Sequence, residues 1–118
     1  MIVALKKNEI FVFGSNTAGR HGAGAALQAK MHFGAQYGVG EGFTGMCYAI
    51  PTLDSNFRKR THEDLKRSVD TFLQVARDTP KLTFLVTKIG CGLAGYSEWY
   101  IQGLFRDIPA NVILPEGW

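Results

Sequence analysis

The sequence is poor in the residues that form disulfide frameworks and metal clusters. It has only two cysteines, Cys47 and Cys91, and they make no C-x-x-C pair. Its three histidines are scattered along the chain and lack the spacing of metal ligands. We therefore expect two reduced thiols, no metal ion and no cofactor.

Long hydrophobic runs are absent as well. No apolar run approaches the roughly 18 residues that would span a membrane. Residues 1–9, MIVALKKNE, lack the long apolar region and the small-residue cleavage site of a signal peptide. These absences predict a cytoplasmic protein without a membrane partner. The hydrophobic fraction of 46% is typical of a folded chain, and 118 residues suit one domain spanning residues 1–118.

The charge is weakly positive. The net charge is +3, and five of the thirteen basic residues fall between residues 58 and 67. Phe57 could stack on a base there, and the basic residues 58–60 could contact phosphates, so residues 57–67 are a candidate surface for RNA or another polyanion. A solvated loop is the competing interpretation, because Glu63 and Asp64 weaken the positive field.

The hydrophobic pattern alternates between strands and helices. This order predicts an α/β fold with three layers, α/β/α, around a mixed, largely parallel sheet. Pro51 is expected to end the third strand, and Thr61 is expected to cap the second helix. Strands are predicted at residues 2–5, 9–14, 46–50, 82–86 and 111–115, helices at 22–34, 61–79 and 97–108, and a loop at 34–45.

The buried faces of two helices follow from their periodicity. In the first predicted helix, Ala23, Ala26, Leu27 and Met31 share one face, which we expect to pack on the sheet. In the last predicted helix, the inward positions run as far as Ile108.

Two glycine-rich loops follow predicted strands. In α/β sheets, ligands bind beyond the carboxyl ends of the strands, so the site should be built from residues 14–24 and 89–97. In the first loop, Gly22 and Gly24 leave backbone amides uncovered near a helix N-terminus, which attracts phosphate. The alternative is close packing of the helix on the sheet. The second loop, GCGLAG, offers few hydrogen-bonding side chains, so a ligand there would meet main-chain N–H groups; the alternative is a structural turn.

A third glycine cluster has a different meaning. Gly40, Gly42 and Gly45 match the dinucleotide pattern G-x-G-x-x-G. That pattern requires a strand before it and a helix after it, whereas this one precedes the strand predicted at residues 46–50. We therefore do not expect a nucleotide at this cluster.

Both predicted site loops resemble those of the macro-domain superfamily. Residues 20–26, RHGAGAA, resemble the R-x-G-A-G-x-A pattern of the terminal ADP-ribose protein glycohydrolase type. Residues 89–93, IGCGL, are similar to the second loop of that type, and residues 92–96 fit the broader pattern G-x-x-G-[YF]. The order and separation of the loops also agree, so the resemblance covers the chain from about residue 11 onward.

The resemblance implies a macro-domain-like fold that binds ADP-ribose, a derivative such as cyclic ADP-ribose, or an ADP-ribosylated target. It places the diphosphate on the amides of residues 91–94, and the terminal ribose beside Asn16 and residues 22–25. Tyr96 would form a wall of the cleft. The predicted ligand-binding residues are Gly14, Ser15, Asn16, Gly22, Ala23, Gly24, Ala25, Gly90, Cys91, Gly92, Leu93, Ala94, Gly95 and Tyr96.

The chain departs from this glycohydrolase type at two positions. Leu53 stands nearest to the lysine of that type, and Ala94 stands in place of its acidic residue. The covalent lysine mechanism is therefore lost. Two functions stay open: a binding module, and a hydrolase of ADP-ribosyl linkages without a lysine. The hydrolase would use Asn16, His21 or Asp54 with water, although His21 also fits an exposed loop and Asp54 a turn.

Overall fold

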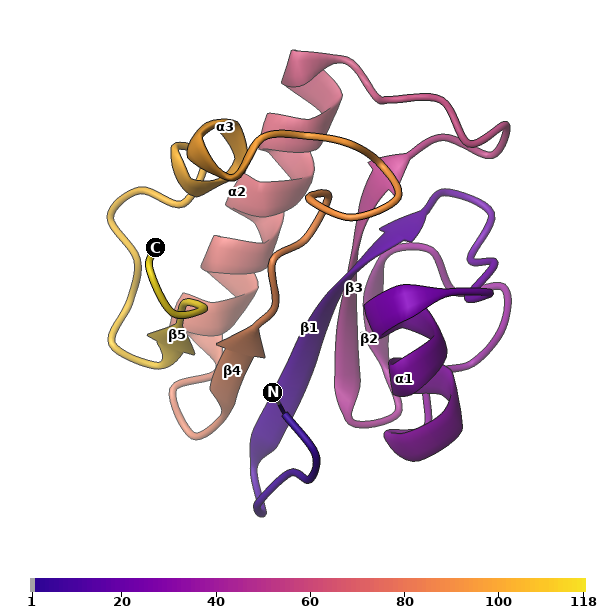
Figure 1. Ribbon diagram of the computed structural model, residues 1–118. Coiled ribbons are helices and arrows are strands. Elements are labelled where there is room, and N and C mark those ends of the chain that lie inside the picture. Colours follow the sequence, from indigo (N-terminus) through magenta and orange to yellow (C-terminus); the bar gives the residue numbers. More distant parts are fainter. Residues whose placement is uncertain (1) are drawn as a thin grey trace.

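The fold is built on a single five-stranded sheet with the strand order β2-β3-β1-β4-β5 (Figure 1). The structure is a computed structural model that describes residues 2–118. The central strand β1 pairs in parallel with β3 and β4, β4 pairs in parallel with β5, and only β2 is antiparallel to its neighbour β3. The predicted α/β class and the mixed, largely parallel sheet are confirmed. The elements are β1 Glu9–Asn16, α1 Gly24–His32, β2 Gly42–Thr44, β3 Cys47–Leu53, α2 His62–Asp78, β4 Thr83–Val86, α3 Glu98–Gln102 and β5 Val112–Ile113.

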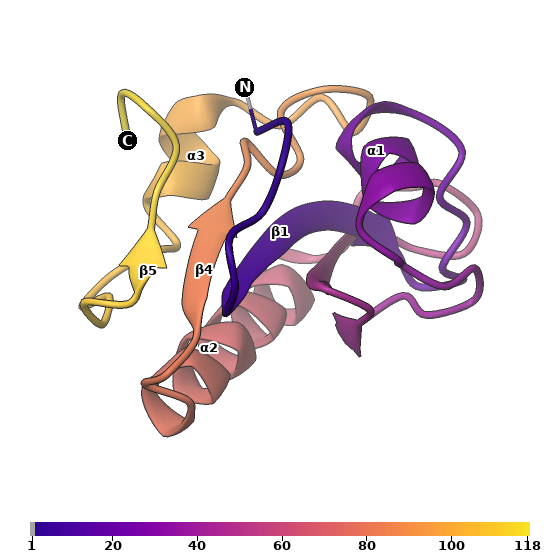
Figure 2. The same cartoon turned by 90° about the horizontal axis from the view of Figure 1, so that it is seen from below.

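Helices lie on both faces of the sheet. Figure 2 shows α2 and α1 on opposite sides of β1. On the α2 side, Phe72 is fully buried, with ring centroids 5.0 Å from Tyr48 and 5.3 Å from Phe84. On the α1 side, Phe11 and Phe13 of β1 form a second cluster with the small residues of α1. The alternating side chains of β1 thus enter two separate cores, which is why its sequence is almost continuously apolar.

The helix α2 begins where the sequence predicts. The Thr61 hydroxyl oxygen accepts a hydrogen bond from the amide of Asp64 at 3.1 Å, and Glu63 and Asp64 lie in the first turn. The side-chain oxygen satisfies one of the free amides of the first turn, and the carboxylates favour the positive end of the helix dipole. The predicted cap is confirmed.

The third strand, however, does not end at Pro51. β3 continues to Leu53, and Pro51 lies opposite Ser15 of β1. The Pro51 carbonyl accepts a hydrogen bond from the Arg60 guanidinium at 2.9 Å, so the polar edge of this residue faces away from β1. The short strand β2 does not reach this position, because its pairing stops at Ala49. The missing proline N–H therefore costs the sheet no hydrogen bond.

Three further expectations are wrong. Residues 2–5 form no strand; Ile2 and Leu5 instead pack against the cluster on the α1 side. The predicted loop 34–45 contains β2. Ile108 lies beyond the short helix α3 and is 37% exposed. Each error concerns a short segment, where tertiary pairing outweighs the local pattern.

The buried face of α1 also differs from the prediction. Ala26 and Ala29 are buried against the sheet, whereas Met31 is 67% exposed and Leu27 is also exposed. Two alanines let the helix axis approach the sheet closely, and the larger Phe33 fills the space beyond the helix end. Within residues 2–118, no helix has the length and apolar character needed to cross a membrane.

Candidate functional site

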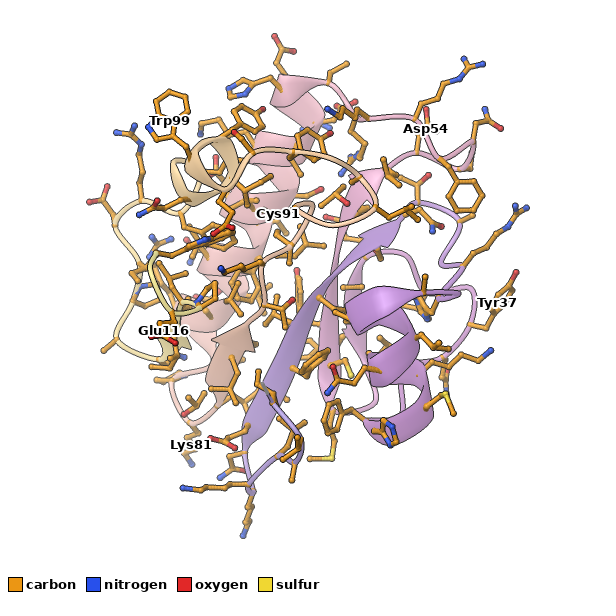
Figure 3. All side chains as sticks on the ribbon, viewed as in Figure 1. Tyr37, Asp54, Lys81, Cys91, Trp99 and Glu116 are labelled. Atoms are coloured by element: carbon orange, nitrogen blue, oxygen red, sulfur yellow. The ribbon has the colours of Figure 1, made fainter. Side chains whose placement is uncertain are left out.

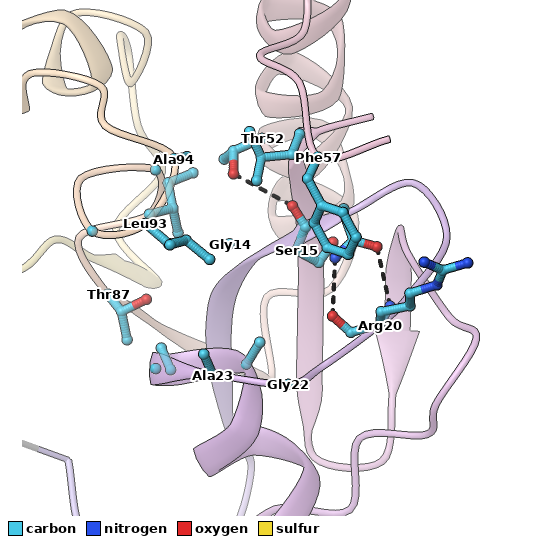
Figure 4. Close-up of a pocket in the computed structure, with 18 of the residues that line it drawn as sticks. Gly14, Ser15, Arg20, Gly22, Ala23, Thr52, Phe57, Thr87, Leu93 and Ala94 are labelled. Atoms are coloured by element: carbon cyan, nitrogen blue, oxygen red, sulfur yellow. Dashed lines mark hydrogen bonds between the residues drawn. The ribbon is translucent and has the colours of Figure 1, made fainter. Parts of the chain in front are cut away.

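A pocket of about 310 Å³ lies at the carboxyl ends of β1, β3 and β4. Both predicted glycine loops line it, so the two loops do face each other across one pocket (Figure 4). This position follows from the parallel pairing of the three strands, whose carboxyl ends meet at one edge of the sheet. The lining residues are Gly14, Ser15, Asn16, Arg20, Gly22, Ala23, Gly24, Ala25, Ala26, Thr52, Leu53, Phe57, Thr87, Lys88, Ile89, Gly90, Gly92, Leu93 and Ala94.

The first wall of the pocket is the N-terminus of α1. The cap residue Ala23 makes no side-chain hydrogen bond to the helix. The first amides of a helix have no hydrogen-bond acceptor within the helix itself. Because Ala23 offers no capping oxygen, the amides of Gly24, Ala25 and Ala26 have no side-chain acceptor either. All three residues line the pocket. The wall therefore presents N–H groups and the positive end of a helix dipole.

The second wall is the loop at residues 90–96. Two internal hydrogen bonds fold it: the amide of Tyr96 donates to the carbonyl of Gly90 at 2.8 Å, and that of Gly95 donates to the carbonyl of Gly92 at 3.0 Å. In the described part of the chain, the amides of Gly92, Leu93 and Ala94 donate to no protein acceptor. Three consecutive free amides beside a pocket form a nest suited to an anion.

Two glycines in these walls have no explanation within the protein alone. Gly22 and Gly92 do not adopt the positive φ values that favour glycine, and a Cβ atom added to either would meet no atom within 4 Å. Neither backbone strain nor packing therefore requires glycine there. A ligand that approaches the backbone closely would require it. By contrast, Gly90 has a φ of 73°, so its conformation accounts for it.

The charge of the pocket is positive. Arg20 and Lys88 line it, and none of the described residues that line it carries a carboxylate, an imidazole or a thiol. Lys88 also forms an ion pair with Glu98, with Nζ 3.1 Å from Oε1, so its field is partly neutralised. The combination of free amides and a guanidinium favours an anionic ligand.

Asn16 lies at the pocket, but its side chain is engaged elsewhere. Its amide nitrogen donates to the carbonyl of Arg20 at 2.9 Å, and its carbonyl oxygen accepts from the amide of Arg20 at 3.0 Å. Asn16 is 6% exposed. The side chain thus closes the turn that carries the first loop, and acts as a positioning residue in the present geometry.

This arrangement predicts that Asn16→Ala lowers stability. The variant loses both hydrogen bonds to Arg20, which should reduce the free energy of unfolding by about 1–3 kcal/mol. Asn16→Asp should also destabilise, because a carboxylate oxygen would face the carbonyl of Arg20. Urea unfolding measures both effects. An Asn16→Ala protein with wild-type stability and no ligand binding would instead assign Asn16 directly to the ligand.

His21 does not line the pocket. The residue is 1% exposed, its Nε2 lies 3.1 Å from the carbonyl oxygen of Val39, and its ring packs edge-on against Phe13. Burial lowers the pKa of the imidazole, because the charged form would lose its hydration. The interpretation of His21 as an exposed loop residue is wrong. Its position also gives no support to a role as general acid or base at the pocket, which it does not line.

The other candidate side chains also lie outside the pocket lining. Asp54 sits in the loop after β3, well separated from Cys91 (Figure 3), and its Oδ1 accepts from the amides of Arg58 and Asn56 at 3.0 and 2.8 Å. These hydrogen bonds, that of Arg58 foremost, lower the pKa of the carboxyl. Asp54 thus has the geometry of a turn former.

Cys91 does not line the pocket either. Burial raises the pKa of its thiol, which disfavours a reactive thiolate.

Tyr96 supports the second loop from outside the pocket. Its hydroxyl donates to the carbonyl of Thr52 at 3.0 Å and lies 3.4 Å from that of Arg60. The Lys59 ammonium lies 4.9 Å from the centre of its ring, and the same ammonium donates to the carbonyl of Gly95 at 3.3 Å. Gly95 and Tyr96 therefore fix the loop and do not line the pocket.

Several lining residues were absent from the predicted ligand set. Thr52 and Thr87 lie at the carboxyl ends of β3 and β4, where the strand order alone could have placed them. Arg20 lies within the motif that carries the resemblance. The sequence predicts for Phe57 only a place on an RNA surface, because a loop residue six positions after Pro51 carries no sign of the pocket.

The basic segment 57–67 is largely engaged in internal contacts. The Arg60 guanidinium donates to Ser68 Oγ at 2.8 Å as well as to the backbone of β3. Lys66 pairs with Asp70 at 2.6 Å, and Arg67 pairs with Asp64 at 3.1 Å. These contacts weaken the positive field that an RNA surface would need.

Comparisons with known proteins add no assignment. No family model matches the chain, and no curated protein matches its sequence significantly. In residues 2–118, no group of three or more His, Cys, Asp or Glu side chains is arranged to hold a metal ion.

Proposed function

We propose that this protein binds ADP-ribose or a related nucleotide in the pocket between the two glycine loops, as a macro-domain-like protein. One observation carries the proposal: residues 24–26 and 92–94, whose backbone amides have no protein acceptor, line one pocket, and no acidic residue among residues 2–118 lines it with them. Backbone amides bind phosphate oxygens without the flexibility of long side chains. The amides of residues 92–94 hold the diphosphate, and the end of α1 lies against the ribose.

The same pocket favours binding over hydrolysis. Hydrolysis of an ADP-ribosyl linkage needs a base that activates water, or a nucleophile. The hydroxyl groups of Ser15, Thr52 and Thr87 donate to backbone carbonyls, and Leu53 and Ala94 supply neither a nucleophile nor an acid. We therefore propose a reader or sequestering module for ADP-ribosyl groups, free or attached to a target.

Calorimetric titration tests the binding. We expect saturable binding of ADP-ribose and weaker binding of AMP, because AMP lacks the second phosphate and the terminal ribose. Cyclic ADP-ribose, which retains the diphosphate, should also bind. The absence of heat from all three ligands at millimolar concentration would overturn the proposal.

Two further measurements address the other functions. Incubation with an ADP-ribosylated protein should release no ADP-ribose beyond the rate without the protein; release that the Asn16, His21 and Asp54 variants abolish would establish the hydrolase. A gel-shift titration with single-stranded RNA tests residues 57–67. A salt-sensitive shift that ADP-ribose does not displace would favour the polyanion surface instead.

A further inference from the structure

His21 is a buried titratable residue of the first loop, and the proposed binding gives it no role. The residue is 1% exposed, and among residues 2–118 its Nδ1 atom has no hydrogen-bond partner. The other ring nitrogen, Nε2, lies 3.1 Å from the carbonyl oxygen of Val39. A carbonyl oxygen can only accept a hydrogen bond, so Nε2 carries the proton and Nδ1 keeps a bare lone pair. The buried ring is therefore neutral.

The surroundings of the ring oppose a second proton. Phe13 of β1 packs edge-on against the imidazole, with ring centroids 5.2 Å apart, and offers no acceptor. Glu41, two residues after Val39, forms no ion pair with the ring. Burial holds the pKa of His21 below its ordinary value, and the positive charge of Lys30 on α1 acts in the same direction. A proton on Nδ1 would thus be a buried charge without a counter-ion and a buried donor without an acceptor.

The position of the ring is tied to the pocket through the chain. The neighbours of His21 on both sides, Arg20 and Gly22, line the pocket. The backbone of Arg20 is held by Asn16, and α1 begins at Gly24, three residues after the histidine. A ring that leaves its buried site moves this backbone with it. The wall made by the N-terminus of α1 therefore depends on a neutral imidazole.

We propose that His21 makes the first loop sensitive to acid: protonation expels the ring, opens residues 20–24 and withdraws one wall of the pocket. The part that concerns the ligand rests on the proposed function, whereas the opening itself does not. In the open loop the imidazole is hydrated and takes up a proton below about pH 6.5, but in the closed loop it stays neutral. Acid therefore favours the open loop, and the closed loop is most stable above this pH.

Hydrogen exchange followed by NMR tests the opening. Two amides report on the ends of the loop: that of Arg20 donates to the side chain of Asn16 at 3.0 Å, and that of Leu27 donates to the carbonyl of Ala23 at 3.2 Å. Their protection is corrected for the intrinsic exchange rate. Between about pH 7.5 and about pH 5.5 it should fall by up to about tenfold, the linkage expected for one proton taken up below about pH 6.5.

Two substitutions assign this fall to the imidazole. His21→Gln keeps an N–H group for the carbonyl of Val39 but cannot take up a proton, so the protection in this variant should stay the same at both pH values. His62→Gln is the matched control, because it removes an exposed histidine at the start of α2. It should retain the wild-type fall. Equal pH dependence in the wild type and His21→Gln would refute the inference.

Wild-type measurements decide the matter even where His21→Gln does not fold. Unchanged protection at about pH 5.5, or a proton found on Nδ1 of His21 at about pH 7.5 by nitrogen NMR, would each contradict the proposal. Saturating ADP-ribose at the lower pH should restore the protection, because it binds the closed loop. Bound ADP-ribose that leaves the protection low would separate the loop from the pocket and overturn the inference. A protein that binds no ADP-ribose at either pH contradicts the proposed function, while the exchange data still decide the opening.

Discussion

A Gly22→Asp variant is expected to fold like the wild type and to lose nucleotide binding by a factor of about 100 or more. The fold should tolerate the side chain, because a Cβ atom at Gly22 would meet nothing within 4 Å and the residue has no positive φ. The carboxylate would enter a pocket that no acidic residue among residues 2–118 lines. At about 5 Å from a phosphate and an effective dielectric constant of about 20, like-charge repulsion costs about 3 kcal/mol.

Calorimetry measures this loss, and Gly22→Asn is the matched control. Asparagine has nearly the same shape as aspartate but no charge, so the difference between the two variants isolates the electrostatic part. Added salt should restore part of the affinity of Gly22→Asp, because it screens the repulsion. Equal binding by Gly22→Asp and wild type, with both proteins folded, would show that the diphosphate held by residues 92–94 does not come close to the first loop.

The location of the pocket could be predicted from the sequence because it depends on topology. Parallel strands bring their carboxyl ends to one edge of a sheet, so glycine loops after β1 and β4 had to lie close together. The cap at Thr61 was predictable for a similar reason: a hydroxyl, two acidic residues and an apolar periodicity all indicated the same start. Where several local signals indicate the same helix start, tertiary packing seldom changes it.

The direction of individual side chains could not be predicted. Asn16 and His21 are residue types that bind ligands or catalyse reactions, yet the structure uses Asn16 to close a turn and buries His21 against Phe13. Side chains alternate between the two faces of a strand. The irregularity in pairing between Ser15 and Asn16 interrupts this alternation, so the face on which the side chain of Asn16 lies does not follow from the pattern of β1. In α1, the buried residues are the alanines Ala26 and Ala29, and the larger Leu27 and Met31 are exposed. Small side chains on the buried face let the helix pack close to the sheet, which the periodicity alone does not predict.

Gly40, the first glycine of the segment that resembles a dinucleotide fingerprint, has a structural role together with the two residues before it. Gly40 lies against the end of β1, and the hydroxyl of Ser15 donates to its carbonyl. Nearby, the amide of Gly38 donates to the carbonyl of Gly19 at 2.8 Å, and the carbonyl of Val39 meets the His21 ring. Residues 38–40 thus brace the first loop from behind, and none of them lines the pocket.

Gly40→Ala is therefore expected to cause a large loss of stability and of the pocket with it. A Cβ atom at Gly40 would lie 2.5 Å from the carbonyl oxygen of Asn16 and 2.7 Å from that of Thr17. Both contacts are with backbone, so no flexible side chain can yield, and β1 or residues 38–40 must move. Overpacking of this kind costs about 3 kcal/mol. Urea unfolding should show this decrease, and ADP-ribose binding should weaken as Asn16 and Thr17 shift.

Gly42→Ala is the control for this experiment. Gly42 has a φ of 94°, but a Cβ atom there would meet nothing within 4 Å, so its substitution introduces backbone strain of about 1 kcal/mol without a clash. It also lies in β2, away from the lining of the pocket. The two variants should therefore differ clearly in both stability and binding. Equal stability losses would show that the backbone at residues 38–40 can move aside, and that the first loop does not depend on its support.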